Sequence, residues 1–188
     1  MNREEKTMLV IDCCIRGEES ATRRYYQAYL NTLPASTPVT VLNLMEQDIA
    51  PLTAADLARR DAVSFDDELF RYARQFKEAD EILIAAPLWD LSFPSLLKVY
   101  LEQVCVAGLT FGYEGSDCVG YCKADRVLFF STCGGFVGGN HLGFHYVKAL
   151  AAMLGIPTCV PYIIEGMDID PNQRENLLAE AIRRLQKE

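Results

Sequence analysis

The chain has 188 residues, half of them hydrophobic, and a formal net charge of -8. This length and apolar content predict one domain, residues 1–188, with a sizeable core. The acidic charge argues against a nucleic-acid partner, because clustered Lys and Arg supply most affinity for phosphate backbones. The N-terminus lacks the pattern of a signal peptide, and no segment approaches the roughly 18 apolar residues of a membrane span. We therefore expect a cytoplasmic protein with no membrane partner.

Seven cysteines are an odd number in a chain without an export signal, which indicates reduced thiols rather than a disulfide framework. Cys118 and Cys122 have a metal-like spacing, but no second pair or nearby histidine completes four ligands. The two histidines, His141 and His145, lie four residues apart on one expected helix, and the spacing supplies no carboxylate partner. We therefore predict no metal site.

Five short segments are expected to be strands, and two of them, the first and the third, are apolar runs typical of buried strands in a parallel sheet. They cover residues 7–13, 39–44, 81–86, 126–131 and 157–164. Helices are expected between them over residues 20–33, 95–107 and 141–154, with one broken helix or two short helices before the third strand and a terminal helix after residue 170. This alternation predicts an α/β fold with a doubly wound parallel sheet covered by helices on both faces.

Several residues mark where the expected elements begin and end. Ser20 is a helix N-cap, and Thr53 with Asp56 and Ser64 with Asp67 resemble helix-start caps. Gly108 is expected to end the helix that begins at residue 95. Residues 111–123 are rich in Gly and turn formers, which indicates a long loop or a hairpin.

Three loops follow the first, third and fourth strands, and in a doubly wound sheet they meet at the edge where such sheets bind ligands. The first loop places Ser20 and Thr22 at a helix N-terminus, where free N–H groups and the helix dipole favour a phosphate. Arg16 would add a charge-assisted contact. Glu18 and Glu19 oppose an anion unless they point outward, and ordinary helix capping by Ser20 is the alternative.

The second loop holds Trp89 between two prolines that restrain the backbone, so a planar ring with polar edges would suit it. The alternative is that Trp89 fills the core. In the third loop, Gly134 and Gly135 allow close backbone approach to a ligand, although tight turning explains these glycines as well. GGFVGG lacks the G-x-G-x-x-G spacing of a dinucleotide fingerprint. No Ser/His/Asp or Cys/His triad can be argued.

The segments PLWDLSFPSLLKVYLEQV and AGLTFGY, with TCGG after the fourth strand and RGEESAT after the first, resemble the FMN-dependent NADH-azoreductases and NAD(P)H-quinone oxidoreductases. The resemblance covers nearly the whole chain and is most specific from Pro87 through Pro94 to Lys98. It implies a flavodoxin-like five-stranded parallel sheet of strand order 2-1-3-4-5. It also implies a homodimer whose flavin pocket is completed across the interface.

The resemblance implies FMN as the cofactor, with its phosphate on the first loop, its ring and ribityl chain against the second, and its ring edge near the third. The residues implied to bind FMN are Cys13, Arg16, Ser20, Ala21, Thr22, Pro87, Leu88, Trp89, Asp90, Leu91, Thr132, Cys133, Gly134 and Gly135. Phe111 and Tyr113 match aromatic positions of azoreductases and His141 matches only by position, so these three are the implied substrate-binding residues.

The implied reaction passes a hydride from NADH or NADPH through flavin N5 to a quinone, azo or nitro compound by a ping-pong mechanism, with no catalytic side chain predicted. A flavodoxin-type electron carrier and an FMN-binding sensor without turnover are the alternatives. The sensor is suggested by Cys13, Cys14 and Cys133, which replace the serines and the arginine that are found at these positions in azoreductases.

A dimer is also predicted from the residues themselves. The expected helix over residues 95–106 has only four polar residues, so it is apolar around more than the one face that a sheet covers. The expected helix over residues 141–154 is similar. Two such helices predict a buried surface for a partner chain.

Overall fold

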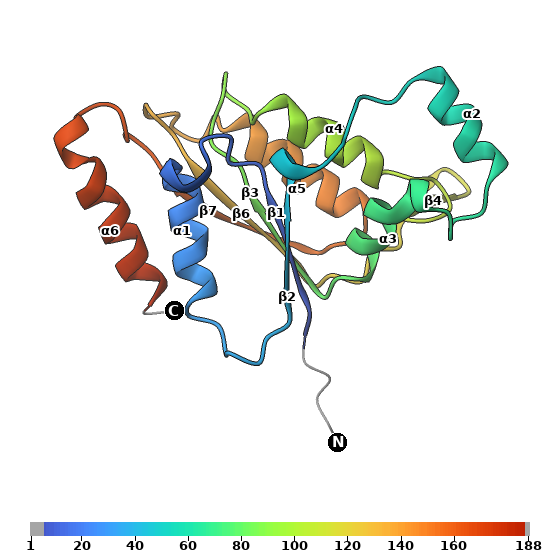
Figure 1. Cartoon of the computed structure of the whole chain (residues 1–188), viewed down its shortest axis with the longest axis horizontal. Helices are drawn as coiled ribbons and strands as arrows, with labels where there is room; N and C mark the ends of the chain where they lie inside the picture. Colours follow the sequence, from blue (N-terminus) through green and yellow to red (C-terminus); the bar gives the residue numbers. More distant parts are fainter. Residues whose placement is uncertain (1–5, 187–188) are drawn as a thin grey trace.

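A computed structural model describes residues 6–186 of the chain. Its main sheet has five parallel strands in the order β2-β1-β3-β6-β7, which confirms the predicted order 2-1-3-4-5 of the main-sheet strands (Figure 1). The strands are β1 (Met8–Asp12), β2 (Val39–Asn43), β3 (Glu81–Ala85), β6 (Arg126–Thr132) and β7 (Thr158–Ile164).

Helices cover both faces of this sheet, as predicted (Figure 1). On one face lie α1 (Ala21–Leu30) and α6 (Arg174–Leu185). On the other lie α3 (Arg71–Glu78), α4 (Ser95–Val104) and α5 (Leu142–Met153). A further helix, α2 (Ala54–Ala62), has no buried residue and projects at the edge of the domain. Short 3-10 segments are η1 (Gly17–Glu19), η2 (Leu44–Glu46), η3 (Glu68–Phe70) and η4 (Pro171–Gln173).

Each face of the sheet has its own hydrophobic core, and the side chains of β1 alternate between the two. Met8 and Val10 pack with α1 and α6, whereas Leu9 and Ile11 pack with α3, α4 and α5. All four side chains are buried because successive residues of a strand point to opposite faces and helices cover both. The next two residues, Asp12 and Cys13, continue this alternation into the loop.

The ends of some elements differ from the prediction. The helix that begins at Ser95 ends at Val104, three residues before the expected end, because Thr110 Oγ1 donates to the carbonyl of Val104 and accepts from the N–H of Val106. Gly108 then follows in the left-handed region, with φ of 83°. Earlier in the chain, the side chain of Asp67 accepts from the N–H of Leu69 and caps the start of η3. The predicted cap at residue 64 is therefore wrong.

The glycine-rich segment after α4 forms a hairpin rather than a long loop, with strands β4 (Phe111–Glu114) and β5 (Asp117–Gly120). Its exit is fixed by two bonds, from the N–H of Cys122 to Leu154 O and from the N–H of Lys123 to Lys77 O. Both acceptors lie at the C-terminal ends of helices that run antiparallel to the sheet strands. The hairpin therefore stands at the amino edge of the main sheet.

The apolar surface of α4 is mostly covered within the chain. Tyr100 stacks edge-on against Tyr72 of α3, with ring centroids 5.6 Å apart, and Lys98 lies over the ring of Tyr146 in α5. Within α4, Leu97, Tyr100, Leu101 and Val104 are thus buried in the chain, whereas Leu96 and Val99 stay partly exposed. Within residues 6–186, no helix is both long and apolar enough to cross a membrane, and no three potential metal ligands cluster together.

Candidate functional site

A cavity of about 100 Å³ lies at the carboxyl edge of the main sheet, where the loops after β1, β3, β6 and β7 meet. This is the edge that the sequence predicted, and nine of the residues implied to bind a cofactor line the cavity. They are Arg16, Ser20, Ala21, Pro87, Leu88, Trp89, Thr132, Cys133 and Gly134. The structure therefore brings the three predicted loops together around one space.

The loop after β3 forms a tight turn that presents Trp89. The N–H and carbonyl of Trp89 exchange hydrogen bonds with those of Ser92, at 3.2 and 2.8 Å. Between them, Asp90 and Leu91 have backbone φ angles of 48° and 66°, values that residues other than glycine rarely adopt. Trp89 is 48 % exposed and lines the cavity, so the alternative that it fills the core is wrong. Such strained turns cluster at functional sites.

The loop after β1 offers hydrogen-bond donors to the cavity. Ser20 caps α1 by accepting from the N–H of Arg23, at 3.3 Å, and it also lines the cavity. The amides of Ala21 and Thr22 belong to the first turn of α1, where helical N–H groups have no intrahelical partner. With the guanidinium of Arg16 on the same side, the donor set suits an anion. The cap and the anion site thus use the same helix end.

Three implied cofactor residues are fully buried. Thr22 is fully buried, and its hydroxyl forms a 2.7 Å hydrogen bond with that of Thr132, which joins α1 to the end of β6. Cys13 is fully buried in the core beneath α4, so its thiol lies outside the cavity, and burial raises its pKa to about 12. Burial likewise raises the pKa of Cys133 to about 12, so both thiols stay protonated at neutral pH.

The loop after β7 supplies lining residues that the sequence analysis missed: Met167, Asp168 and Arg174. The N–H of Asp168 donates to Gly134 O, and its carboxylate lies 3.5 Å from Arg174 Nη1. A Cβ on Gly134 would lie 2.5 Å from Asp168 Oδ2, so a glycine allows this close approach, whereas a Cβ on Gly135 would meet only open space. Arg174 is thus a second arginine, with Arg16, among the lining residues.

Exposed apolar side chains surround this polar cavity. They come from the loops after β1, β3, β6 and β7 and from the start of α5, and they are Ile15, Trp89, Leu91, Phe136, Leu142 and Ile169. A monomeric protein seldom gathers large exposed apolar residues in one region without a ligand or partner. The site thus combines donors and two arginines inside with an apolar rim outside.

The three residues implied to bind substrate lie outside the cavity. Phe111 and Tyr113 contact each other in β4, with ring centroids 5.9 Å apart, and Tyr113 is 68 % exposed. Both residues belong to β4, which lies beyond the C-terminal end of α4, whereas the Trp89 turn precedes the N-terminal end of α4 (Figure 1). Within one chain they cannot contact a molecule bound there.

His141 is a structural residue, so the expectation that it contacts substrate is not met. It is 3 % exposed, and its Nδ1 accepts from the N–H of Phe144 at the start of α5. Its Nε2 lies 3.0 Å from Ser131 Oγ and therefore carries the proton of the neutral ring. Burial lowers the pKa of His141, which favours this neutral form. The next N–H, of Leu142, donates to Leu91 O and attaches α5 to the Trp89 turn.

Comparison with known proteins decides the family. A family model described as a flavodoxin-like fold matches residues 6–188. The chain belongs to this flavodoxin-like family. One family relative is "FMN-dependent NADH:quinone oxidoreductase 2" of Clostridium acetobutylicum, 30 % identical over 172 residues that cover 87 % of this chain and 86 % of the relative. Another, "FMN-dependent NADH:quinone oxidoreductase 1" of Pseudomonas syringae pv. tomato, is 31 % identical over 197 residues, which cover 96 % and 97 %.

Solved structures share the flavodoxin-like fold over nearly the whole chain. The azoreductase AzrA superposes with a TM-score of 0.82 at 24 % identity, over 96 % of this chain and 97 % of that one. An FMN-dependent NADH-azoreductase from Bacillus anthracis in complex with FMN gives 0.80 at 19 % identity, over 97 % and 98 %. At these identities the likeness shows the fold alone.

Proposed function

We propose that this protein is an FMN-dependent NAD(P)H oxidoreductase that reduces a quinone or azo compound, with nitro compounds as further acceptors, by a ping-pong mechanism. The observation that carries the proposal is the Trp89 turn: a strained loop exposes an aromatic ring beside a donor-rich cavity at the carboxyl edge of the sheet. The names of the family relatives support the same activity.

The residues present fit FMN. Its phosphate suits the first turn of α1, where Arg16, Ser20 and the amides of Ala21 and Thr22 supply donors, and Arg174 adds positive charge. The isoalloxazine ring suits the half-exposed ring of Trp89. The open space at Gly135 leaves room for the ring edge. The chemistry that FMN supplies when bound is hydride uptake from NADH or NADPH and hydride delivery to a second molecule.

The chain's own part in the reaction is to bind and orient. The neutral ring of His141 fixes the start of α5, and the Leu142 N–H holds Leu91 O, so the Trp89 turn rests on a fixed support. The buried thiols of Cys13 and Cys133 have pKa values near 12 and take no part in proton transfer at neutral pH. Alternating use of one pocket by donor and acceptor is the ping-pong scheme.

A homodimer belongs to the same proposal, on grounds other than the apolar helices. The apolar rim is exposed in one chain, and Phe111 and Tyr113 lie too far from their own cavity to line it. In a dimer the rim would be covered and the two aromatic residues would line the partner's pocket. Sedimentation at micromolar concentration should give a dimer; a monomer would contradict this part of the proposal.

The activity is tested by steady-state assays of the purified protein supplied with FMN. NADH or NADPH oxidation should require FMN and accelerate when a quinone is added, and double-reciprocal plots at several quinone concentrations should be parallel. No FMN binding would refute the enzyme and the electron carrier alike. FMN that binds but is not reduced by either nicotinamide would leave the electron carrier or the sensor.

A further inference from the structure

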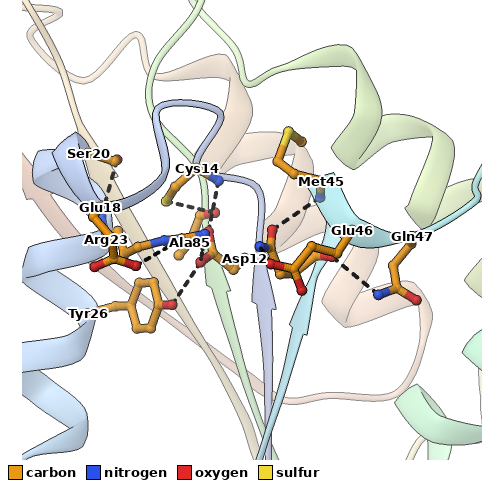
Figure 2. Close-up of polar contacts among 11 residues, drawn as sticks. Asp12, Cys14, Glu18, Ser20, Arg23, Tyr26, Met45, Glu46, Gln47 and Ala85 are labelled. Atoms are coloured by element: carbon orange, nitrogen blue, oxygen red, sulfur yellow. Dashed lines mark hydrogen bonds and ion pairs between the residues drawn. The ribbon is translucent and has the colours of Figure 1, made fainter.

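A buried ion pair lies directly beneath the loop between β1 and α1 (Figure 2). Asp12, the last residue of β1, is 1 % exposed, and Arg23, in the first turn of α1, is 9 % exposed. Arg23 Nη2 is 2.7 Å from Asp12 Oδ2. Removing two charges from water costs about as much as their attraction returns, so folding stability is a weak reason for such a pair. Its contacts point to another role.

The side chains of the pair attach the loop at two places, and the backbone of Arg23 holds it at a third. The N–H of Cys14 donates to Asp12 Oδ1 at 2.8 Å, and Arg23 Nη1 donates to Glu18 Oε1 at 3.1 Å. The backbone N–H of Arg23 donates to Ser20 Oγ. Figure 2 shows these side chains converging on Asp12 and Arg23 from the loop above them. The two side chains therefore fix the beginning and the middle of the loop, at Cys14 and Glu18.

A further contact comes from α1 and does not involve the loop. Tyr26 is 3 % exposed, and its hydroxyl donates to Asp12 Oδ2 at 2.8 Å. Burial, with the nearby Asp12 carboxylate, raises the pKa of Tyr26, so the hydroxyl remains a donor at neutral pH. This bond braces the carboxylate from the helix side, so its removal offers a control that leaves the loop contacts in place.

The contacts of Asp12 and Arg23 with the loop determine which of its groups face the cavity. Arg16, Ser20 and Ala21 line it. Glu18, held by Arg23, does not line it, although its side chain is 80 % exposed. The one carboxylate already in the lining, Asp168, lies 3.5 Å from Arg174, and a second carboxylate without such a partner would repel an anion. The ion pair thus keeps donors on the cavity side and a negative charge on the other side.

We propose that Asp12 and Arg23 are positioning residues for the anion-binding loop, which hold its donors toward the phosphate group of the ligand and Glu18 away from it. This role rests on the proposed function, because the ligand phosphate is that of FMN. It predicts that the pair affects recognition of the phosphate much more than recognition of the flavin ring.

The test uses the full chain with the double substitution Asp12→Asn and Arg23→Met. The double variant leaves no unpaired buried charge, and the amide oxygen of the new asparagine remains an acceptor for the N–H of Cys14. Tyr26→Phe is the matched control, because it removes a buried hydrogen bond to the same carboxylate without touching the loop. If the double variant does not fold, Arg23→Lys is measured in the same way, because it keeps a cation opposite Asp12 and loses the planar fork that also reaches Glu18.

Two readouts follow, neither of which needs turnover. The dissociation constant for FMN should rise about tenfold in the double variant, the effect of losing one hydrogen bond to a charged group, while that for riboflavin, which lacks the phosphate, changes less than about twofold. Hydrogen exchange of the amides of residues 13–20 should become faster in the ligand-free variant. Tyr26→Phe should change neither the FMN-to-riboflavin ratio nor the exchange of the loop.

Equal losses for FMN and riboflavin, or unchanged exchange in the loop, would overturn the positioning role. Its failure is separable from that of the proposed function. If the unmodified chain bound no FMN while loop exchange rose in the variant, the FMN proposal would fall and the control of the loop by the ion pair would stand. If FMN bound the unmodified chain and the variant equally well, only the positioning role would fall.

Discussion

Replacing Trp89 by Ala separates binding from folding at the candidate site. Trp89 is 48 % exposed, so its truncation removes only about half of the contacts that make a fully buried Trp→Ala change cost about 3–5 kcal/mol. We therefore expect the free energy of unfolding to fall by about 2.5 kcal/mol at most. Stacking between an aromatic side chain and a planar heterocycle contributes about 1–3 kcal/mol, so the dissociation constant for FMN should rise between about 5-fold and 150-fold.

The assay is a fluorescence titration of FMN alongside urea unfolding of the ligand-free protein. Phe65→Ala is the matched control, because Phe65 is 42 % exposed and packs edge-on against Phe70 at a centroid distance of 5.4 Å, away from the cavity lining. It should lower stability to a similar degree and leave FMN binding unchanged. A Trp89 variant that lost several kcal/mol of stability but bound FMN normally would refute the reasoning and restore a core-packing role.

Three further predictions concern other parts of the molecule. Arg174→Gln should weaken FMN binding about tenfold, and riboflavin binding little, in parallel titrations, because one charged partner of the phosphate is lost; equal effects on both ligands would place Arg174 elsewhere. Gly120→Ala should destabilise the chain by several kcal/mol in urea unfolding, because its Cβ would lie 1.9 Å from the backbone N of Gly155, where nothing can move aside easily; unchanged stability would contradict this packing. Burial lowers the pKa of His141 in the folded chain, so its contribution to stability is fully present above the unfolded pKa of about 6.5 and declines as pH falls below it. Between pH 7 and 5, the free energy of unfolding measured in urea should therefore fall more steeply with decreasing pH for the unmodified chain than for His141→Asn. The same dependence on pH in both chains would count against the neutral buried ring.

The main sheet was predictable because each of its strands is a short apolar run between turn formers. In a chain of alternating strands and helices, an apolar run such as residues 81–86 predicts a strand that is buried on both faces. The ends of elements were less predictable. The helix that starts at Ser95 stops at Val104 because Thr110, six residues further on, bonds the backbone there, and no local pattern indicates such a contact.

The candidate site was predictable where it depends on loop position and less so where it depends on side-chain direction. The loops after β1, β3 and β6 do meet, as the topology requires. Cys13 was misassigned to the site, although the alternation of Leu9 and Ile11 already directs it into the core beneath α4. The same alternation puts Asp12 on the α1 face, and a buried carboxylate at a strand end was an available signal for the ion pair with Arg23.

Other site features had weaker signals. The residues after β7 were not assigned to the site, although the strand itself was predicted. The carboxyl ends of parallel strands lie at one edge, so the loop that leads to Arg174 belonged with the others. The position of Phe111 and Tyr113 could not be predicted, because it depends on how the β4–β5 hairpin docks on the ends of α3 and α5.

The central claim is that the cavity and the Trp89 turn hold FMN in a form that a nicotinamide can reduce. The most direct measurement mixes the FMN-loaded protein with NADH or NADPH in a stopped-flow spectrophotometer without oxygen and then adds a quinone. We predict that the absorbance of the oxidised flavin is lost when about one equivalent of NADH or NADPH per bound FMN has been added. The absorbance should return in full when the quinone is added. A chain that bound no FMN, or whose bound FMN kept its absorbance with both nicotinamides, would contradict the account.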